Sequence, residues 1–156
     1  MAIAIADLLD PRQVRLRLRS RTAENAIQEL VTALNGRDGV ADPTKLERDV
    51  VGREREQPSI VESEVVFPHA RTDAVEKIVL AIGIKPAGIP FGLAGERAKV
   101  IFLIGVPRRL VNDYLVAVGG LARVARRDTV RQRLLRAGSP EEFIELLRGA
   151  LTSETI

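Results

Sequence analysis

The pattern of hydrophobic and polar positions in the first third of the chain predicts one strand followed by one helix. Residues 14–19 alternate valine or leucine with arginine, the period-two pattern of a half-buried strand at a sheet edge. Residues 23–34 then carry hydrophobic side chains at helical spacing. Ser20 or Thr22 is placed to cap the start of this helix, and the pair Asn35-Gly36 is placed to stop it.

The middle of the chain predicts a second helix and then three buried strands. Asp42 is a candidate N-cap and Pro43 suits the first helical position, and the helix is expected to end before Pro58. Three short runs rich in β-branched residues follow, each bounded by proline or glycine. Their continuous hydrophobicity predicts strands covered on both faces. These runs are residues 64–67, 77–84 and 98–106.

From residue 110 onward the spacing of hydrophobic positions is helical. Two helices are expected before Gly138, and a third starts with Ser139 as N-cap, Pro140 at the first position and Glu142 at the third. The predicted order is therefore β-α-α-β-β-β-α-α-α, which indicates an α/β fold with three layers, α/β/α, and a mixed β-sheet. No repeat or linker interrupts the chain, so residues 1–156 are expected to form a single domain.

Composition excludes several kinds of chemistry. The 156 residues are 46% hydrophobic and 29% charged, which is typical of a globular protein, and they include no cysteine and one histidine. Disulfides, thiolate catalysis and a structural zinc site are thereby excluded within one chain, and no metal or cofactor is expected. No hydrophobic run reaches the roughly 18 residues needed to cross a bilayer, and the N-terminus lacks the basic region of a signal peptide. A cytoplasmic location without membrane insertion is therefore expected.

The net charge of +3 comes mainly from arginine, and arginine is densest in residues 123–136. Such a segment is either a nucleic-acid footprint or the solvated face of a helix. The helical interpretation is favoured because aromatic residues make up only 3% of the chain, which leaves few stacking platforms for nucleotide bases. No nucleic-acid partner is expected.

The single histidine, His69, is the strongest candidate for chemistry. Pro68 favours an extended Phe67, so His69 is expected just past the end of a strand, where open α/β sheets place ligands. Without cysteine or a metal site, a neutral imidazole can still act as a nucleophile toward phosphorus, a step that needs charge stabilisation more than acid–base groups. Arg53 and Arg71 are candidate partners for a phosphoryl group, because a guanidinium binds its oxygens bidentately.

These residues carry a resemblance to a known family. The segments "RERE" at 53–56 and "FPHART" at 67–72, followed by "DAVEKIVLAIGI" and "GERAKVIFLIGVP", resemble the enzyme IIA domain of the bacterial phosphoenolpyruvate-dependent phosphotransferase system. The class is that of the fructose, mannitol and nitrogen-regulatory domains (EIIA type 2). The resemblance covers nearly the whole chain and implies that His69 accepts a phosphoryl group from the histidine phosphocarrier protein. It also implies that Arg53 stabilises that group.

The sequence departs from the family pattern near the histidine. Ile60, Glu62 and Glu64 stand where the family has glycines, and Tyr114 stands where many members have a second histidine. Carboxylates at these positions could face an incoming phosphate, and one such like-charge pair costs about 4 kcal/mol at about 4 Å and an effective dielectric constant near 20. Tyr114 can still donate a hydrogen bond to a phosphoryl oxygen, so it is grouped with Arg71 as phosphate-binding.

Three functional hypotheses remain open at this point. In the first, His69 carries a phosphoryl group, either for a sugar permease component or as a nitrogen-regulatory signal, and the regulatory version is preferred because the chain begins at a methionine with no fused permease. In the second, the domain no longer transfers phosphate and regulates a kinase or transporter by binding. A nucleic-acid binder using residues 123–136 ranks last; its binding would fall steeply with salt and would persist without His69.

Overall fold

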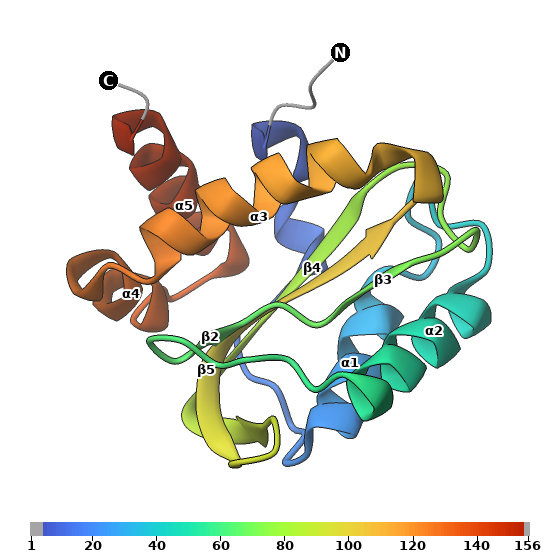
Figure 1. Cartoon of the computed structure of the whole chain (residues 1–156). Coiled ribbons are helices and arrows are strands. Elements are labelled where there is room, and N and C mark those ends of the chain that lie inside the picture. Colours follow the sequence, from blue (N-terminus) through green and yellow to red (C-terminus); the bar gives the residue numbers. More distant parts are fainter. Residues whose placement is uncertain (1–4, 155–156) are drawn as a thin grey trace.

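A computed structural model describes residues 5–154, and Figure 1 shows one twisted sheet between two groups of helices. The strands are β1 (Val14–Arg15), β2 (Val65–Val66), β3 (His69–Arg71), β4 (Val79–Phe91) and β5 (Glu96–Val106). The α-helices are α1 (Ala23–Ala33), α2 (Pro43–Glu56), α3 (Val111–Ala125), α4 (Asp128–Leu135) and α5 (Pro140–Glu154). Three short 3₁₀ helices are η1 (Ile5–Leu8), η2 (Pro11–Gln13) and η3 (Arg108–Leu110).

The sheet is built on the long antiparallel hairpin of β4 and β5. Strand β1 pairs with β4 in parallel and forms one edge, while β2 and β3 both pair with β5 in parallel and form the other. The sheet is therefore mixed. The predicted α/β class with three layers, α/β/α, and a mixed β-sheet is confirmed.

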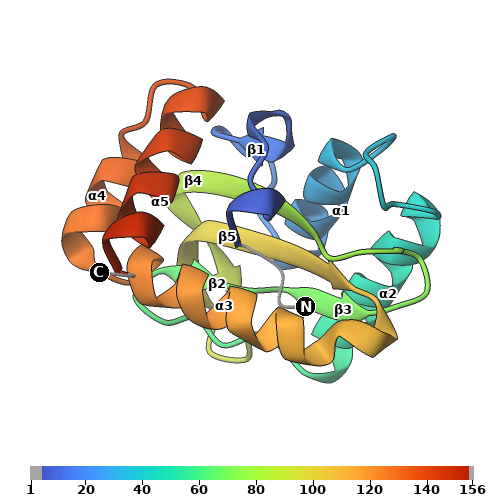
Figure 2. The same cartoon turned by 90° about the horizontal axis from the view of Figure 1, so that it is seen from above.

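Each face of the sheet is covered by its own helices. Helices α1 and α2 pack on one face, and α3, α4 and α5 lie over the other (Figures 1 and 2). Successive residues of β5 serve opposite faces: Ile101 and Leu103 belong to the cluster under α1 and α2, and Phe102 belongs to the cluster under α3 and α5. Burial on both faces explains why the strands read as continuous hydrophobic runs.

The helix starts follow the predicted capping chemistry. The hydroxyl of Thr22 accepts a hydrogen bond of 3.2 Å from the backbone N–H of Asn25, and the carboxylate of Asp42 accepts one of 3.0 Å from the N–H of Lys45. The hydroxyl of Ser139 likewise accepts the N–H of Glu142 at 3.1 Å. These bonds satisfy backbone donors that have no partner inside the helix.

The structure corrects the predicted environment of His69. The histidine follows the end of β2, as predicted, but it is also the first residue of an additional strand, β3, opposite Ile104 of β5. Strands β2 and β3 keep the same register on β5 and are separated only at Phe67 and Pro68. Proline has no N–H to donate, but its carbonyl still accepts the N–H of Ile104 at 3.0 Å. The predicted order thus lacked one strand.

The first strand is shorter than predicted but does form a sheet edge. Only Val14 and Arg15 pair with β4, and the N–H of Leu18 then bonds to the carbonyl of Ile84 at 3.1 Å. Val14 and Leu18 are buried while Arg17 is exposed. The alternating pattern therefore predicted which side chains are buried, even after Arg15, where the pairing with β4 ends. Within residues 5–154 no helix is both long and apolar enough to span a membrane.

Candidate functional site

A cavity of about 580 Å³ lies where β3, helix α2 and the start of α3 meet. His69, Arg53, Arg71 and Tyr114, the four site residues predicted from the sequence, all line it. The other lining residues are Arg48, Asp49, Gly52, Glu56, Ala70, Arg108 and Val111. The fold therefore brings together residues as far apart in the chain as Arg48 and Tyr114.

Helix α2 contributes one side of the cavity through residues spaced at helical intervals. Asp49, Arg53 and Glu56 lie on the same face, and Gly52 between them adds no side chain. Arg55 is also on α2 but makes a 2.6 Å ion pair with Glu24 of α1 and does not line the cavity.

The ring of His69 is held by the backbone just before it. Its Nδ1 lies 2.9 Å from the carbonyl oxygen of Phe67. A carbonyl can only accept, so Nδ1 carries the proton in this contact, and a neutral ring then has its lone pair on Nε2. The ring of Tyr114 lies beside it, with centroids 5.0 Å apart and planes inclined by 33°.

Electrostatics keep His69 neutral. Burial lowers the pKa of His69 below its usual value of 6.5; the hydrogen bond to Phe67 and the charge of Glu54 oppose this, and the positive charge of Arg53 lowers the pKa further. Burial also raises the pKa of Tyr114, so its hydroxyl keeps its proton at neutral pH. The site therefore offers a neutral imidazole beside a phenol that can donate.

The cations of the cavity differ in how they are held. The guanidinium groups of Arg53 and Arg71 are exposed and make no hydrogen bond or ion pair with any other residue that the structure describes. Arg108 has a long ion pair of 3.5 Å with Asp73. Arg53 and Arg71 can therefore turn toward an anion in the cavity without breaking an existing pair.

Asp49 is a structural member of the site. Its carboxylate accepts hydrogen bonds from the hydroxyl of Thr72 at 2.6 Å and from the ammonium group of Lys45 at 3.0 Å. Burial acts to raise the pKa of Asp49, but these two donors outweigh it and the pKa lies below the usual range. The charge of Asp49 is thus balanced within the protein.

Comparison with known proteins identifies the family. Residues 7–150 match the family model of the phosphoenolpyruvate-dependent sugar phosphotransferase system, EIIA 2. The chain belongs to this family. A fructose-specific EIIA component from Haloferax volcanii is 32% identical over 127 residues, which cover 81% of this chain and 82% of that protein. The family model belongs to a sugar phosphotransferase system, which indicates a phosphoryl carrier.

Other EIIA proteins similar to this chain include a longer multidomain protein and solved structures with the same fold. A fructose-specific EIIABC component of Bacillus subtilis is 27% identical over 92% of this chain, but the chain spans only 23% of that protein. The nitrogen regulatory protein IIA-Ntr of Neisseria meningitidis has the same fold, with a TM-score of 0.81, 20% identity and coverage of 92% and 98%. A complex of enzyme IIA-mannitol with phosphorylated enzyme IIB-mannitol of Escherichia coli contains a further example, with a TM-score of 0.75, 23% identity and coverage of 90% and 97%.

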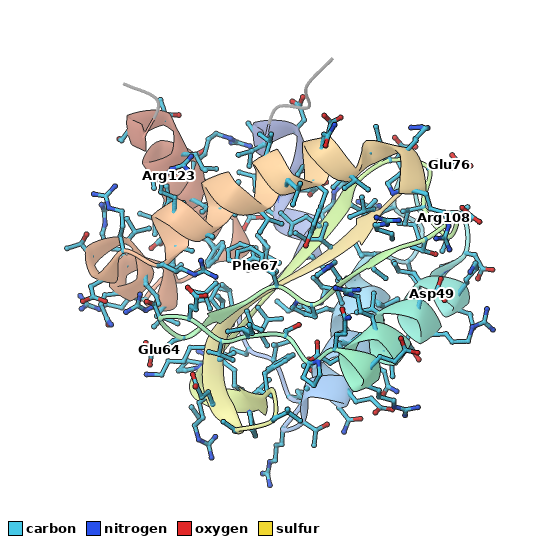
Figure 3. The ribbon with its side chains drawn as sticks, viewed as in Figure 1. Asp49, Glu64, Phe67, Glu76, Arg108 and Arg123 are labelled. Atoms are coloured by element: carbon cyan, nitrogen blue, oxygen red, sulfur yellow. The ribbon has the colours of Figure 1, made fainter. Side chains whose placement is uncertain are left out.

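Glu62 and Glu64, the two acidic residues near His69 in the sequence, do not line the cavity. Glu64 binds the ammonium group of Lys99 at 2.9 Å and the Nε of Arg131 at 3.2 Å, and Glu62 pairs with Arg126 at 3.4 Å. In Figure 3, Glu64 lies on the far side of Phe67 from Asp49 and Arg108. Their carboxylates are thus neutralised away from His69.

The basic segment 123–136 has a partly structural role. Its Arg131 is 6% exposed and also bonds to Asp128 and to the carbonyl of Arg126, in addition to Glu64. The guanidinium of Arg126 lies 5.8 Å from the centre of the Phe67 ring. Part of the arginine density in this EIIA domain therefore holds the segment before the histidine.

Sequence reasoning missed Arg48, Asp49 and Arg108 as members of the site. The helical spacing from Asp49 to Arg53 was a usable signal, and so was the position of Arg108 just after a buried strand. No sequence signal pointed to the carbonyl of Phe67, which is a backbone group. Among residues 5–154, no group of three or more acidic, cysteine or histidine side chains is arranged to hold a metal ion.

Proposed function

We propose that this EIIA domain accepts a phosphoryl group on Nε2 of His69 from the histidine phosphocarrier protein. The observation that carries the proposal is the 2.9 Å contact between Nδ1 of His69 and the carbonyl of Phe67. It assigns the proton to Nδ1 and leaves the Nε2 lone pair for attack. The lowered pKa of His69 supports the same conclusion, because only the neutral ring is a nucleophile.

The transfer step needs little beyond positioning and charge. The Nε2 lone pair of His69 forms the new N–P bond while the P–N bond to the donor histidine breaks and its electron pair returns to the donor ring. The His69 ring becomes cationic, and its Nδ1–H remains on the carbonyl of Phe67, which stabilises that charge. Arg53, with Arg71 and the hydroxyl of Tyr114, supplies donors for the phosphoryl oxygens.

A protein donor must cover the rim of the cavity to bring its phosphohistidine to His69. Two large hydrophobic side chains next to Tyr114 on α3 are available for such contact: Leu115 is 59% exposed and Val116 is 55% exposed. Exposed hydrophobic residues beside a reactive group suit a transient protein interface. They support a protein partner over a free small molecule.

The test is intact-mass analysis after incubation with phosphoenolpyruvate, the general phosphotransferase enzyme and the histidine phosphocarrier protein. We expect an acid-labile mass gain in the wild type and none in His69→Ala. A wild type that gains no mass from a donor of verified activity would instead indicate a binding module without phosphotransfer. An equal gain in His69→Ala would assign the acceptor to another residue.

We further propose that the phosphoryl group serves a nitrogen-regulatory-type signal, with sugar uptake as the competing role. The relatives include both kinds of EIIA protein, fructose-specific components and IIA-Ntr. Incubating the phosphorylated domain with the enzyme IIB component of the fructose system separates the roles. Retention of phosphate supports signalling, and rapid transfer to the IIB component supports uptake.

A further inference from the structure

The turn that precedes β2 has an unfavourable backbone conformation. The N–H of Glu62 bonds to the carbonyl of Val65 and the N–H of Val65 to the carbonyl of Glu62, both at 3.0 Å. Its two central residues, Ser63 and Glu64, have φ angles of 51° and 66°. A turn with positive φ at both central positions favours glycine or asparagine, and neither is present here. Contacts with the surrounding structure must therefore stabilise this backbone conformation.

Glu64 supplies that restraint through both its backbone and its side chain. Its carbonyl accepts the N–H groups of Lys99 at 2.8 Å and Val100 at 3.1 Å. Its carboxylate bridges Lys99 on β5 and Arg131 on α4, at 2.9 and 3.2 Å. The Arg131 side chain is only 7% exposed. We call these three residues, Glu64, Lys99 and Arg131, the Glu64 clamp.

Within the Glu64 clamp, Glu64 precedes Phe67, whose carbonyl contacts Nδ1 of His69, by three residues. From Glu64 the chain runs through the paired residues of β2 to Phe67, whose ring stacks on Phe102 with centroids 5.0 Å apart. At the other end, the carbonyl of Pro68 bonds to Ile104 of β5 at 3.0 Å. The segment 65–68 is thus fixed to β5 at both ends, and its position sets where the Phe67 carbonyl meets Nδ1 of His69.

We infer that Glu64 is a positioning residue for phosphoryl transfer: the Glu64 clamp holds segment 65–68 so that the carbonyl of Phe67 keeps the proton of His69 on Nδ1. This inference deepens the proposed function and rests on it for the transfer step. The placement of the ring is a property of the unphosphorylated protein and can be tested separately. Glu64 thereby replaces the conformational freedom of a glycine with a fixed electrostatic contact.

The test uses the full chain and reads out His69 directly. Because the chain holds one histidine, ring-¹⁵N NMR spectra contain signals from His69 alone. We expect Glu64→Gln to lower the fraction of the Nδ1–H tautomer and to reduce the phosphorylation rate constant about tenfold, since small displacements of a reacting group carry large rate costs. The matched control is Glu96→Gln, which removes an exposed acid at the start of β5 and should leave both readouts unchanged.

A second variant separates positioning from stability. Glu64→Gly suits a φ of 66° and removes the carboxylate, so the protein is expected to stay folded while the tautomer and the rate still shift. Lys99→Gln removes one arm of the clamp and should give a smaller shift in the same direction. An unchanged tautomer in folded Glu64→Gln and Glu64→Gly overturns the inference, whatever the rate does.

The two proposals fail in distinguishable ways. If the wild type gains no phosphate, the proposed function fails, yet the tautomer of His69 still reports on the Glu64 clamp. If the wild type is phosphorylated and the tautomer does not respond to Glu64, only the positioning inference fails. A rate loss without a tautomer change also counts against it, because Glu64 would then act by another route.

Discussion

The hydroxyl of Thr72 donates a hydrogen bond of 2.6 Å to the carboxylate of Asp49, and this contact ties the residue that follows strand β3 to helix α2. Thr72 is fully buried and its hydroxyl also accepts the N–H of Ala74 at 3.0 Å. Strand β3 carries His69 and α2 carries Arg53. The pair therefore fixes the two elements whose side chains meet in the cavity.

Replacing Thr72 by valine keeps the shape of the side chain but leaves the N–H of Ala74 without its acceptor. We expect Thr72→Val to lower the free energy of unfolding by about 1–3 kcal/mol, the usual cost of a buried polar group that loses its partner. Urea unfolding measures this. Thr32→Val is the control, since Thr32 is exposed on α1 and its hydroxyl donates to the carbonyl of Gln28 at 3.0 Å. Equal losses in both variants would contradict the proposed tie.

Arg53 is expected to act on the rate and not on stability. Its guanidinium has no ion pair within residues 5–154, so Arg53→Ala should change the free energy of unfolding by less than about 0.5 kcal/mol. The phosphorylation rate constant should fall about 100-fold, the usual effect of removing a donor that stabilises transition-state charge. Arg55→Ala, two residues away and paired with Glu24, is the matched control and should transfer at the wild-type rate. Similar rates in the two variants would remove Arg53 from the mechanism.

The depressed pKa of His69 predicts how stability depends on pH. Burial, the largest cause, disfavours the charged ring in the folded state, so between the folded pKa and about 6.5 the unfolded chain binds more protons. The free energy of unfolding should therefore fall as pH drops below about 6.5 and stop falling below the folded pKa. His69→Gln removes this component. Urea unfolding of both proteins between pH 8 and pH 5 isolates it, and a wild type that gains stability on acidification relative to His69→Gln would show a raised pKa instead.

Tyr114 is predicted to contribute through its hydroxyl. Tyr114→Phe keeps the ring beside His69 but removes the donor, so we expect a three- to tenfold lower phosphorylation rate constant, in line with one hydrogen bond of about 0.5–1.5 kcal/mol. Stopped reactions followed by intact-mass analysis give the rate. Leu115→Ala provides the contrast: it should weaken donor binding and raise KM, because Leu115 is exposed and directly follows Tyr114, which lines the cavity. A Tyr114→Phe variant with wild-type kinetics would limit Tyr114 to packing.

The elements that the sequence predicted well are those defined by local chemistry. Thr22 and Asp42 cap their helices as expected, because capping depends on neighbouring residues only. The strand at 69–71 was missed because three residues flanked by proline carry no periodic signal, and their pairing depends on β5, more than thirty residues away. The cavity was predicted in part: family motifs gave His69 and Arg53, whereas Arg108 joined them only through the fold.

The sequence by itself determined the layered α/β architecture, the single imidazole and an arginine in the last turn of the capped α2. These depend on periodicity, composition and short motifs. Only the tertiary structure decided that Glu62 and Glu64 turn away from His69, and that a backbone carbonyl holds Nδ1. The reason is that a carboxylate takes its direction from the cations it meets, and Lys99, Arg126 and Arg131 reach that turn from β5 and the helices packed over the sheet.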